Sequence, residues 1–284
     1  MTIAKNQRIE GLHGKPILAD VYFTHNNTPK PVVVFIHGFK GFKDWGHFDL
    51  LARTFADYGF VFVKFNFSHN GTTPENLHEI VDLDAFANNN FTKEMDDLGC
   101  VIDHVMADDN KEWQGEIDHE RLCLMGHSRG GGITILKAAE DDRVKKLVTW
   151  ASVNEFGKFW SEDFYEKWRQ KGVTYIENAR TGQQLPMYYQ VYEDYNQNID
   201  RLHIPTAVKN LDKPFLIIHG TDDPAVPYKW GWEMSKWNEN TELLTIEGGD
   251  HTFGAKHPWE KEELPKNAAY VVNQSISFFK GEWN

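Results

Sequence analysis

The residues Gly126-His127-Ser128-Arg129-Gly130 carry the pattern G-x-S-x-G, which can present a serine hydroxyl for nucleophilic attack. The pattern alone is weak because glycine and serine are common, but here it follows the apolar run Leu122–Met125 and precedes a helical pattern. A sharp turn between a strand and a helix strains the serine and exposes its hydroxyl above the sheet edge. The helix N-terminus adds partial positive charge where an oxyanion would form. We therefore predict that Ser128 is a nucleophile.

A serine hydroxyl needs a base, and the base needs an orienting carboxylate. Two later segments offer these groups directly after predicted strands. Asp222 and Asp223 lie in a turn that follows the strand Phe215–Ile218, and His251 follows the last predicted strand. In an open parallel sheet, functional groups gather outside the carboxyl ends of the strands. The sequence therefore predicts His251 as the base and one of the two aspartates as its partner.

The segment His37–Gly41 follows the apolar run Val32–Ile36 at the same predicted edge. This is where an amide that stabilises an oxyanion should lie, so we predict that the backbone N–H groups of Phe39 and Arg129 form the oxyanion hole. Three charged residues beside this segment either touch substrate or belong to an exposed charged loop: Lys40, Lys43 and Asp44.

The elements that position these residues alternate between strands and helices. Apolar, β-branched runs predict strands at Lys30–Ile36, Phe60–Phe65, Arg121–Met125, Val144–Trp150, Pro214–His219 and Leu243–Ile246. Helical spacing of apolar residues predicts helices at Phe48–Tyr58, Thr92–Met106, 129–139 and Ala268–Phe279. This alternation predicts an α/β fold with a mostly parallel central sheet and helices on both faces.

The alternation stops between Trp150 and about Asn210, where the chain is rich in aromatic residues and lacks a strong β run. We interpret residues 154–210 as a helical cap inserted into one domain that spans residues 1–284. Its rings either pack in a core or line an apolar substrate site. Its acids either lie exposed on helices or anchor the amine of a peptide; they are Glu155, Glu162, Asp163, Glu177, Glu193 and Asp194.

The composition excludes several classes of function. A formal charge of −12 and the absence of a Lys/Arg-rich run argue against a nucleic-acid partner. Cys100 and Cys123 both lie in apolar stretches, as expected of free thiols in a reducing compartment. No signal peptide or membrane span is expected, so we predict a cytoplasmic protein. The histidines lack metal-binding spacing, and we expect neither a metal nor another cofactor.

Taken together, four motifs resemble those of the α/β-hydrolase-fold serine hydrolases over about Pro31–Phe279. They are HGFKG (37–41), GHSRGG (126–131), HGTDDPAVP (219–227) and GGDHTF (248–253). The likeness is greatest to bacterial esterases and to dienelactone-hydrolase-like and serine-aminopeptidase-like members. In that family the acid stands four residues after the histidine of the third motif, which implies Asp223, with its neighbour Asp222 as the alternative.

The resemblance implies hydrolysis through a covalent acyl-enzyme formed on Ser128. The aromatic cap favours a carboxylesterase that takes small or aryl esters. An aminopeptidase-like serine peptidase acting on short peptides is the first alternative, since the same residues cleave amides. A catalytically inactive binding module on the same fold is the second.

Overall fold

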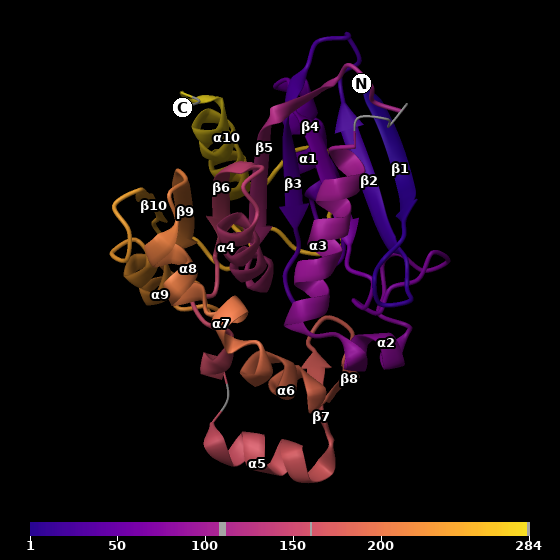
Figure 1. The fold of residues 1–284 in the computed structure, drawn as a ribbon, viewed down its shortest axis with the longest axis vertical. Helices are drawn as coiled ribbons and strands as arrows, with labels where there is room; N and C mark the ends of the chain where they lie inside the picture. Colours follow the sequence, from indigo (N-terminus) through magenta and orange to yellow (C-terminus); the bar gives the residue numbers. More distant parts are fainter. Residues whose placement is uncertain (108–111, 160, 283–284) are drawn as a thin grey trace.

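The computed structural model describes residues 1–107, 112–159 and 161–282, and within them eight strands form one sheet in the order β1-β2-β4-β3-β5-β6-β9-β10 (Figure 1). The strands are β1 (Thr2–Ile9), β2 (Ile17–Phe23), β3 (Lys30–Ile36), β4 (Val61–Asn66), β5 (Ile117–His127), β6 (Val144–Trp150), β9 (Phe215–Gly220) and β10 (Thr241–Ile246). β2 runs antiparallel to both β1 and β4, and the other pairs are parallel. The predicted fold class is confirmed.

Helices cover both faces of this sheet, and each face has its own apolar core. One core is built with α3 (Phe91–Val105), α4 (Arg129–Glu140) and α9 (Tyr228–Met234). The other is built with α1 (Phe48–Asp57) and α10 (Lys266–Lys280). β3 lies in the middle of the sheet and is buried along nearly its whole length, as its continuous apolar run predicts.

The parallel direction of β3, β5, β9 and β10 brings their carboxyl ends to one edge of the sheet. The segments after these strands carry Phe39, Ser128, Asp223 and His251 respectively. The fold therefore collects the four predicted motifs at one edge.

The segment between β6 and β9 lies beyond the carboxyl end of the sheet, at the bottom of Figure 1. Its helices are the 3₁₀ turn η1 (Phe156–Phe159), α5 (Glu162–Lys171), α6 (Gln190–Gln197), α7 (Ile199–Leu202) and α8 (Ile204–Asn210). It also holds an antiparallel hairpin of β7 (Val173–Asn178) and β8 (Gln183–Tyr188). We predicted a helical insertion, and the segment is mostly helical, but the prediction was wrong at this hairpin. Its strands are short, half exposed and rich in polar residues, so they give no apolar β run.

A short helix, α2 (Leu83–Asn88), packs against β8 and links this hairpin to the core. None of the helices in the described ranges is both long enough and apolar enough to span a lipid bilayer.

Candidate active site

Ser128 occupies a sharp turn between the end of β5 and the start of α4. Its backbone has φ 58° and ψ −122°, a strained conformation for a residue with a side chain. Glycine is required on both sides of the turn: a Cβ on Gly126 would collide with Thr134 and with the backbone of Gly130, and one on Gly130 would collide with the backbone of β3 and His37. The turn is held by the N–H of Ser128, which donates to the carbonyl of Trp150 at 2.9 Å.

The carboxylate that contacts His251 belongs to Asp223. His251 Nδ1 lies 2.8 Å from Asp223 Oδ2, and the other oxygen, Oδ1, accepts the backbone N–H groups of Ala225 and Val226 at 2.8 Å each. Asp222 is exposed and accepts a hydrogen bond from the hydroxyl of Thr221. The geometry thus pairs His251 with the aspartate that the family pattern indicates.

The Asp223 side chain is fully buried. Burial alone would raise the pKa of this carboxyl group, but hydrogen bonds from His219 and His251 outweigh it and hold the pKa of Asp223 well below its usual range. Asp223 therefore stays ionised at neutral pH and accepts from His251 Nδ1–H, which leaves the other ring nitrogen free to take a proton.

His127, beside the serine, supports the loop that carries His251. Its Nε2–H donates to the backbone carbonyl of His251 at 2.8 Å, and the two rings lie 4.7 Å apart. Burial, with a smaller contribution from His251, lowers the pKa of His127 to about 3. The ring is therefore a neutral donor that ties the strand before Ser128 to the predicted base.

The segment after β3 approaches the serine closely. A Cβ on Gly38 would lie 3.0 Å from the Cβ of Ser128. Among the described residues, no oxygen accepts a hydrogen bond from the backbone N–H of Phe39 or Arg129. Unpaired amides next to a nucleophile are what an oxyanion hole requires.

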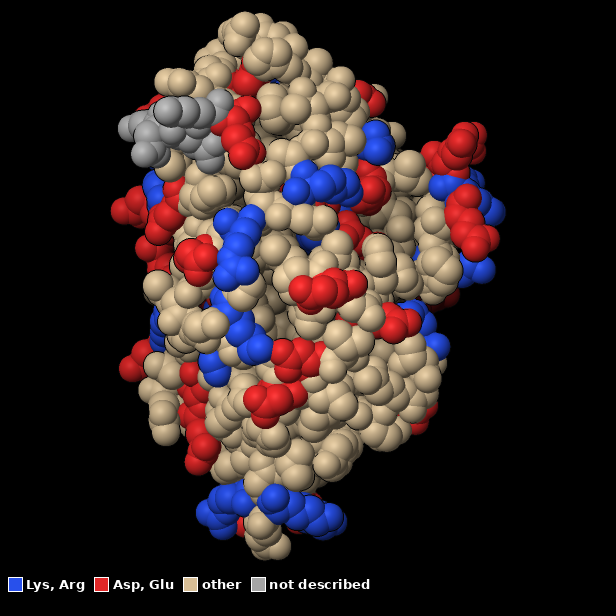
Figure 2. Space-filling model, turned by 90° about the vertical axis from the view of Figure 1, so that its right-hand side faces the viewer, with Lys and Arg blue, Asp and Glu red and all other residues tan. Residues whose placement is uncertain are grey.

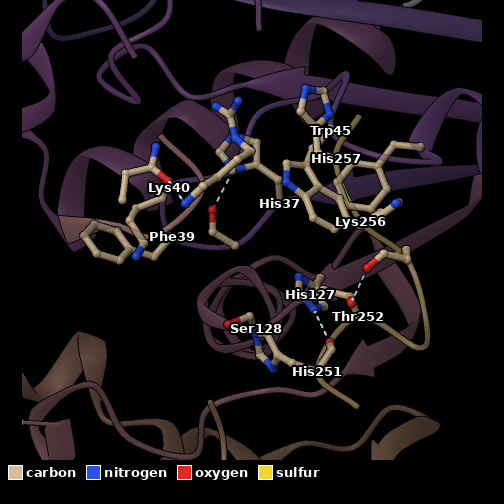
Figure 3. A pocket seen from close by; sticks show the side chains of 16 residues that line it. His37, Phe39, Lys40, Trp45, His127, Ser128, His251, Thr252, Lys256 and His257 are labelled. Atoms are coloured by element: carbon tan, nitrogen blue, oxygen red, sulfur yellow. Dashed lines mark hydrogen bonds between the residues drawn. The ribbon is translucent and has the colours of Figure 1, made fainter. Parts of the chain in front are cut away.

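Ser128 and His251 line one pocket of about 400 Å³ (Figure 3). In that view Ser128, His127, His251 and Thr252 lie on one side, with Phe39 and Lys40 on the other. The aromatic part of the lining comes from the segment after β3 and the start of α1: Phe39, Trp45 and Phe48. The insertion contributes Asn178 and Arg180, at the tip of the β7–β8 hairpin.

None of the aromatic or acidic residues described in the insertion lines this pocket. The rings pack internally instead: Phe156 stacks on Phe91 of α3 at 4.0 Å, and Tyr165 lies 4.1 Å from Tyr192. The sequence reasoning therefore missed both the residues that the insertion brings to the pocket and the origin of its aromatic wall. Of the charged residues beside Phe39, only Lys40 lines the pocket.

The side chain of Arg129 connects the two predicted oxyanion donors. Its guanidinium lies over the rings of Phe39, at 4.9 Å, and Phe91, at 4.6 Å. Glu94 of α3 accepts two hydrogen bonds from it, at 2.7 and 3.1 Å, and a third from the side chain of Asn89. This buried ion pair fixes the position of Arg129 relative to Phe39. No local motif predicts the pair, because Glu94 and Arg129 lie on different helices.

We expect Glu94→Gln to destabilise the protein and to lower kcat more than it changes KM. The substitution leaves a buried guanidinium without its counter-charge, a change that costs on the order of 3 kcal/mol in the free energy of unfolding. A displaced Arg129 amide should also lower kcat by about tenfold. Denaturant unfolding and steady-state kinetics measure the two effects.

The matched control is the double variant Glu94→Leu/Arg129→Met, which removes both charges and keeps the backbone amide of residue 129. Because apolar side chains can replace a buried ion pair, this variant should recover most of the lost stability. Wild-type stability and kinetics in Glu94→Gln would contradict the positioning role.

Three carboxylates come together near the segment between β3 and α1, from Asp20, Asp44 and Asp49. The ammonium groups of Lys43 and Lys64 lie among them: Lys43 is 2.9 Å from Asp20, and Lys64 is 2.6 Å from Asp49. Burial would raise the pKa of Asp20, but Lys64 and Lys43 lower it to about 2. These lysines supply the positive charge that a metal ion would otherwise provide, and the network anchors the loop that carries Phe39 and Trp45.

The two cysteines are free; Cys123 is buried and Cys100 is partly buried. Burial raises the pKa of both thiols, which keeps them protonated and poorly nucleophilic.

Comparisons with a family model, with curated relatives and with solved structures agree on a hydrolase. The model of the prolyl oligopeptidase family, Peptidase_S9, matches residues 46–276. The chain is 27% identical over 256 residues to "Putative esterase YitV" of Bacillus subtilis (strain 168), covering 87% of this chain and 90% of that protein. It is 25% identical over 243 residues to "Uncharacterized peptidase YuxL" of the same organism, covering 82% of this chain and 33% of that protein. Among solved structures, Est1E from Butyrivibrio proteoclasticus superimposes with a TM-score of 0.68 at 18% identity, covering 97% of this chain and 99% of that one.

Proposed function

The chain belongs to the prolyl oligopeptidase family of serine hydrolases, and on this premise we propose that it is a carboxylesterase that cleaves small carboxylic esters. The observation that carries the proposal is the pair of Asp223 and His251, 2.8 Å apart, in the pocket that Ser128 also lines. The strained elbow presents Ser128 at the carboxyl end of the sheet, where the family places its nucleophile. We propose residues 154–210 as a cap over this site.

In the proposed reaction, Ser128 Oγ attacks the ester carbonyl carbon while His251 Nε2 takes the hydroxyl proton. Asp223 holds the tautomer of His251 and stabilises the imidazolium that forms. The amides of Phe39 and Arg129 donate to the oxyanion of the tetrahedral intermediate. His251 then protonates the leaving alcohol, and a water molecule repeats the attack on the acyl-enzyme to release the acid and restore Ser128.

The lining of the pocket favours esters over peptides with a free amine. An aminopeptidase needs an anionic group that pairs with the substrate ammonium, and no acidic side chain of the described residues lines the pocket. The lysine and arginine side chains that do line it would repel such an amine. An ester has no positive charge to place there.

Hydrolysis of matched esters and amides tests this proposal. We expect kcat/KM for 4-nitrophenyl butyrate to exceed that for alanine 4-nitroanilide by much more than tenfold, because the ester is the more reactive acyl donor and because repulsion of the ammonium group adds about 1.4 kcal/mol, or tenfold, in a partly enclosed site. The N-acetylated anilide, which lacks the positive charge, should fall between them. Preference for the free-amine anilide would favour an aminopeptidase instead.

A further inference from the structure

The pocket beside Ser128 has a charge opposite to that of the whole chain. The formal charge of the protein is −12. Three cationic side chains nevertheless line the pocket, Lys40, Arg180 and Lys256, and no aspartate or glutamate of the described residues does. By contrast, the face in Figure 2 shows lysine and arginine side chains interspersed with acids.

These three cations come from separate parts of the fold. Lys40 follows β3, Arg180 lies at the tip of the β7–β8 hairpin, and Lys256 follows the loop of His251. In Figure 3, Lys40 and Lys256 border the space in front of Ser128. The fold thus gathers positive charge at one site from residues far apart in the sequence.

In the described ranges, none of the three forms an ion pair with a carboxylate within 4.0 Å. The ammonium of Lys40 donates to the backbone carbonyl of Glu177 at 3.1 Å, and the guanidinium of Arg180 lies 6.0 Å from the ring of Phe42. Burial lowers the pKa of Lys40, and the charge of Glu177 offsets only part of this effect. Asp44, whose charge acts on His257 of the same pocket, is already paired with Lys43 and Lys64.

His257 adds a neutral hydrogen-bond donor to the lining of the same pocket. Its Nδ1 accepts the backbone N–H of Gly46 at 2.9 Å, which places the proton on Nε2. Its ring stacks on Trp45 and His78. Burial, together with the charges of Arg180 and His78, lowers the pKa of His257 and keeps the ring neutral.

From this arrangement we propose that the pocket binds a carboxylate on the substrate, so that the ester cleaved at Ser128 carries a carboxylate elsewhere in the molecule. Arg180 and Lys256 bind the carboxylate, with Lys40 nearer the oxyanion loop. A guanidinium can donate two parallel hydrogen bonds to a carboxylate. The apolar stem of the substrate contacts Trp45 and Phe48. Catalysis of such an ester rests on the proposed function above, whereas binding of the carboxylate does not.

Two substrates of equal length test the proposal, the mono-4-nitrophenyl ester of adipic acid and 4-nitrophenyl hexanoate. We expect the wild-type protein to prefer the adipate ester by about tenfold or more in kcat/KM, since one charge-assisted hydrogen bond is worth this much. The variant Arg180→Gln/Lys256→Gln should lower the ratio of the two kcat/KM values by about tenfold or more, to near one. Both side chains are exposed, so the variant should fold.

The matched control Lys145→Gln/Lys209→Gln removes the same charge from exposed positions outside the pocket. Lys145 lies at the start of β6, at the end of the sheet opposite Ser128. This control should leave the ratio unchanged. A wild-type ratio near one, unaffected by either variant, would overturn the carboxylate site while leaving the esterase in place.

A binding measurement separates the two proposals. Calorimetric titration of Ser128→Ala with adipate should show binding that weakens by about tenfold or more when Arg180→Gln/Lys256→Gln is added. If neither ester is hydrolysed but this binding is found, the esterase proposal fails and the carboxylate site stands. No difference in adipate binding between the two backgrounds would contradict the site directly.

Discussion

Ser128→Ala should lower kcat on an ester by about 10⁴- to 10⁶-fold, with little change in KM. The serine oxygen forms the covalent bond of the proposed acyl-enzyme. Among the described residues, Thr252 is the one other hydroxyl-bearing residue that lines this pocket. The hydroxyl of Thr252 donates to the carbonyl of Ala255 at 2.7 Å, which commits it to the loop. Initial rates with 4-nitrophenyl butyrate at several enzyme concentrations measure the loss.

The strained backbone at residue 128 does not complicate this test, because serine and alanine meet the same restriction at positive φ. Thermal unfolding of the variant should match that of the wild type. Ser235→Ala serves as the matched control, since Ser235 follows α9, outside the pocket, and its hydroxyl donates to the carbonyl of Trp232. Residual activity of Ser128→Ala above about 1% of wild type would exclude Ser128 as the nucleophile.

Asp223→Asn should lower kcat by about 10⁴-fold although it changes one atom. The Oδ1 of residue 223 accepts two backbone N–H groups, so an asparagine would keep its carbonyl oxygen there and turn its amide toward His251. The Nδ1 of His251 would then accept rather than donate, and the proton would move to Nε2. An imidazole in that tautomer cannot take the proton of Ser128.

The matched control for this substitution is Asp222→Asn. The Asp222 side chain is exposed and, among the described residues, accepts a hydrogen bond only from the hydroxyl of Thr221, so the activity of the variant should stay within about threefold of wild type. Kinetics of both variants at pH 7.5 decide between the two aspartates that the sequence leaves open. A large loss in Asp222→Asn with a small one in Asp223→Asn would reverse the assignment.

The sequence predicts the catalytic edge well because its signals are local. β3 and β6 lie where their apolar runs place them, at Lys30–Ile36 and Val144–Trp150. Each predicted site residue follows a strand, and the parallel order of those strands is enough to bring Ser128 and His251 to one pocket. Turn glycines such as Gly126 mark close backbone approach directly in the sequence.

The rest depends on contacts between distant segments. The antiparallel strands β1 and β2 precede the recognised motifs and carry no marker of their own. In the sequence, nothing distinguishes Glu94 from the other acids of α3. Its contact with Arg129 follows only from the packing of α3 against α4. Arg180 lies in a polar hairpin whose strands are stabilised by pairing with each other, and its position in the pocket follows from the tertiary fold alone.

The aromatic residues of the insertion show how composition can mislead. Their number suggests an aromatic substrate site, but rings also pack readily on one another and on the core. Phe156, Trp168 and Tyr195 are all buried in that way. The insertion instead presents an arginine and an asparagine to the pocket, and the expected character of the substrate changes from aromatic to anionic.

Labelling with a fluorophosphonate tests the central claim most directly, because this probe bonds only to a serine that is activated by a functioning base. Mass spectrometry of the digested protein should locate a single adduct on Ser128. The adduct should be absent in Ser128→Ala and should form much more slowly in Asp223→Asn. No adduct on the folded wild-type protein would indicate an inactive binding module, and an adduct on a different serine would contradict the proposed active site.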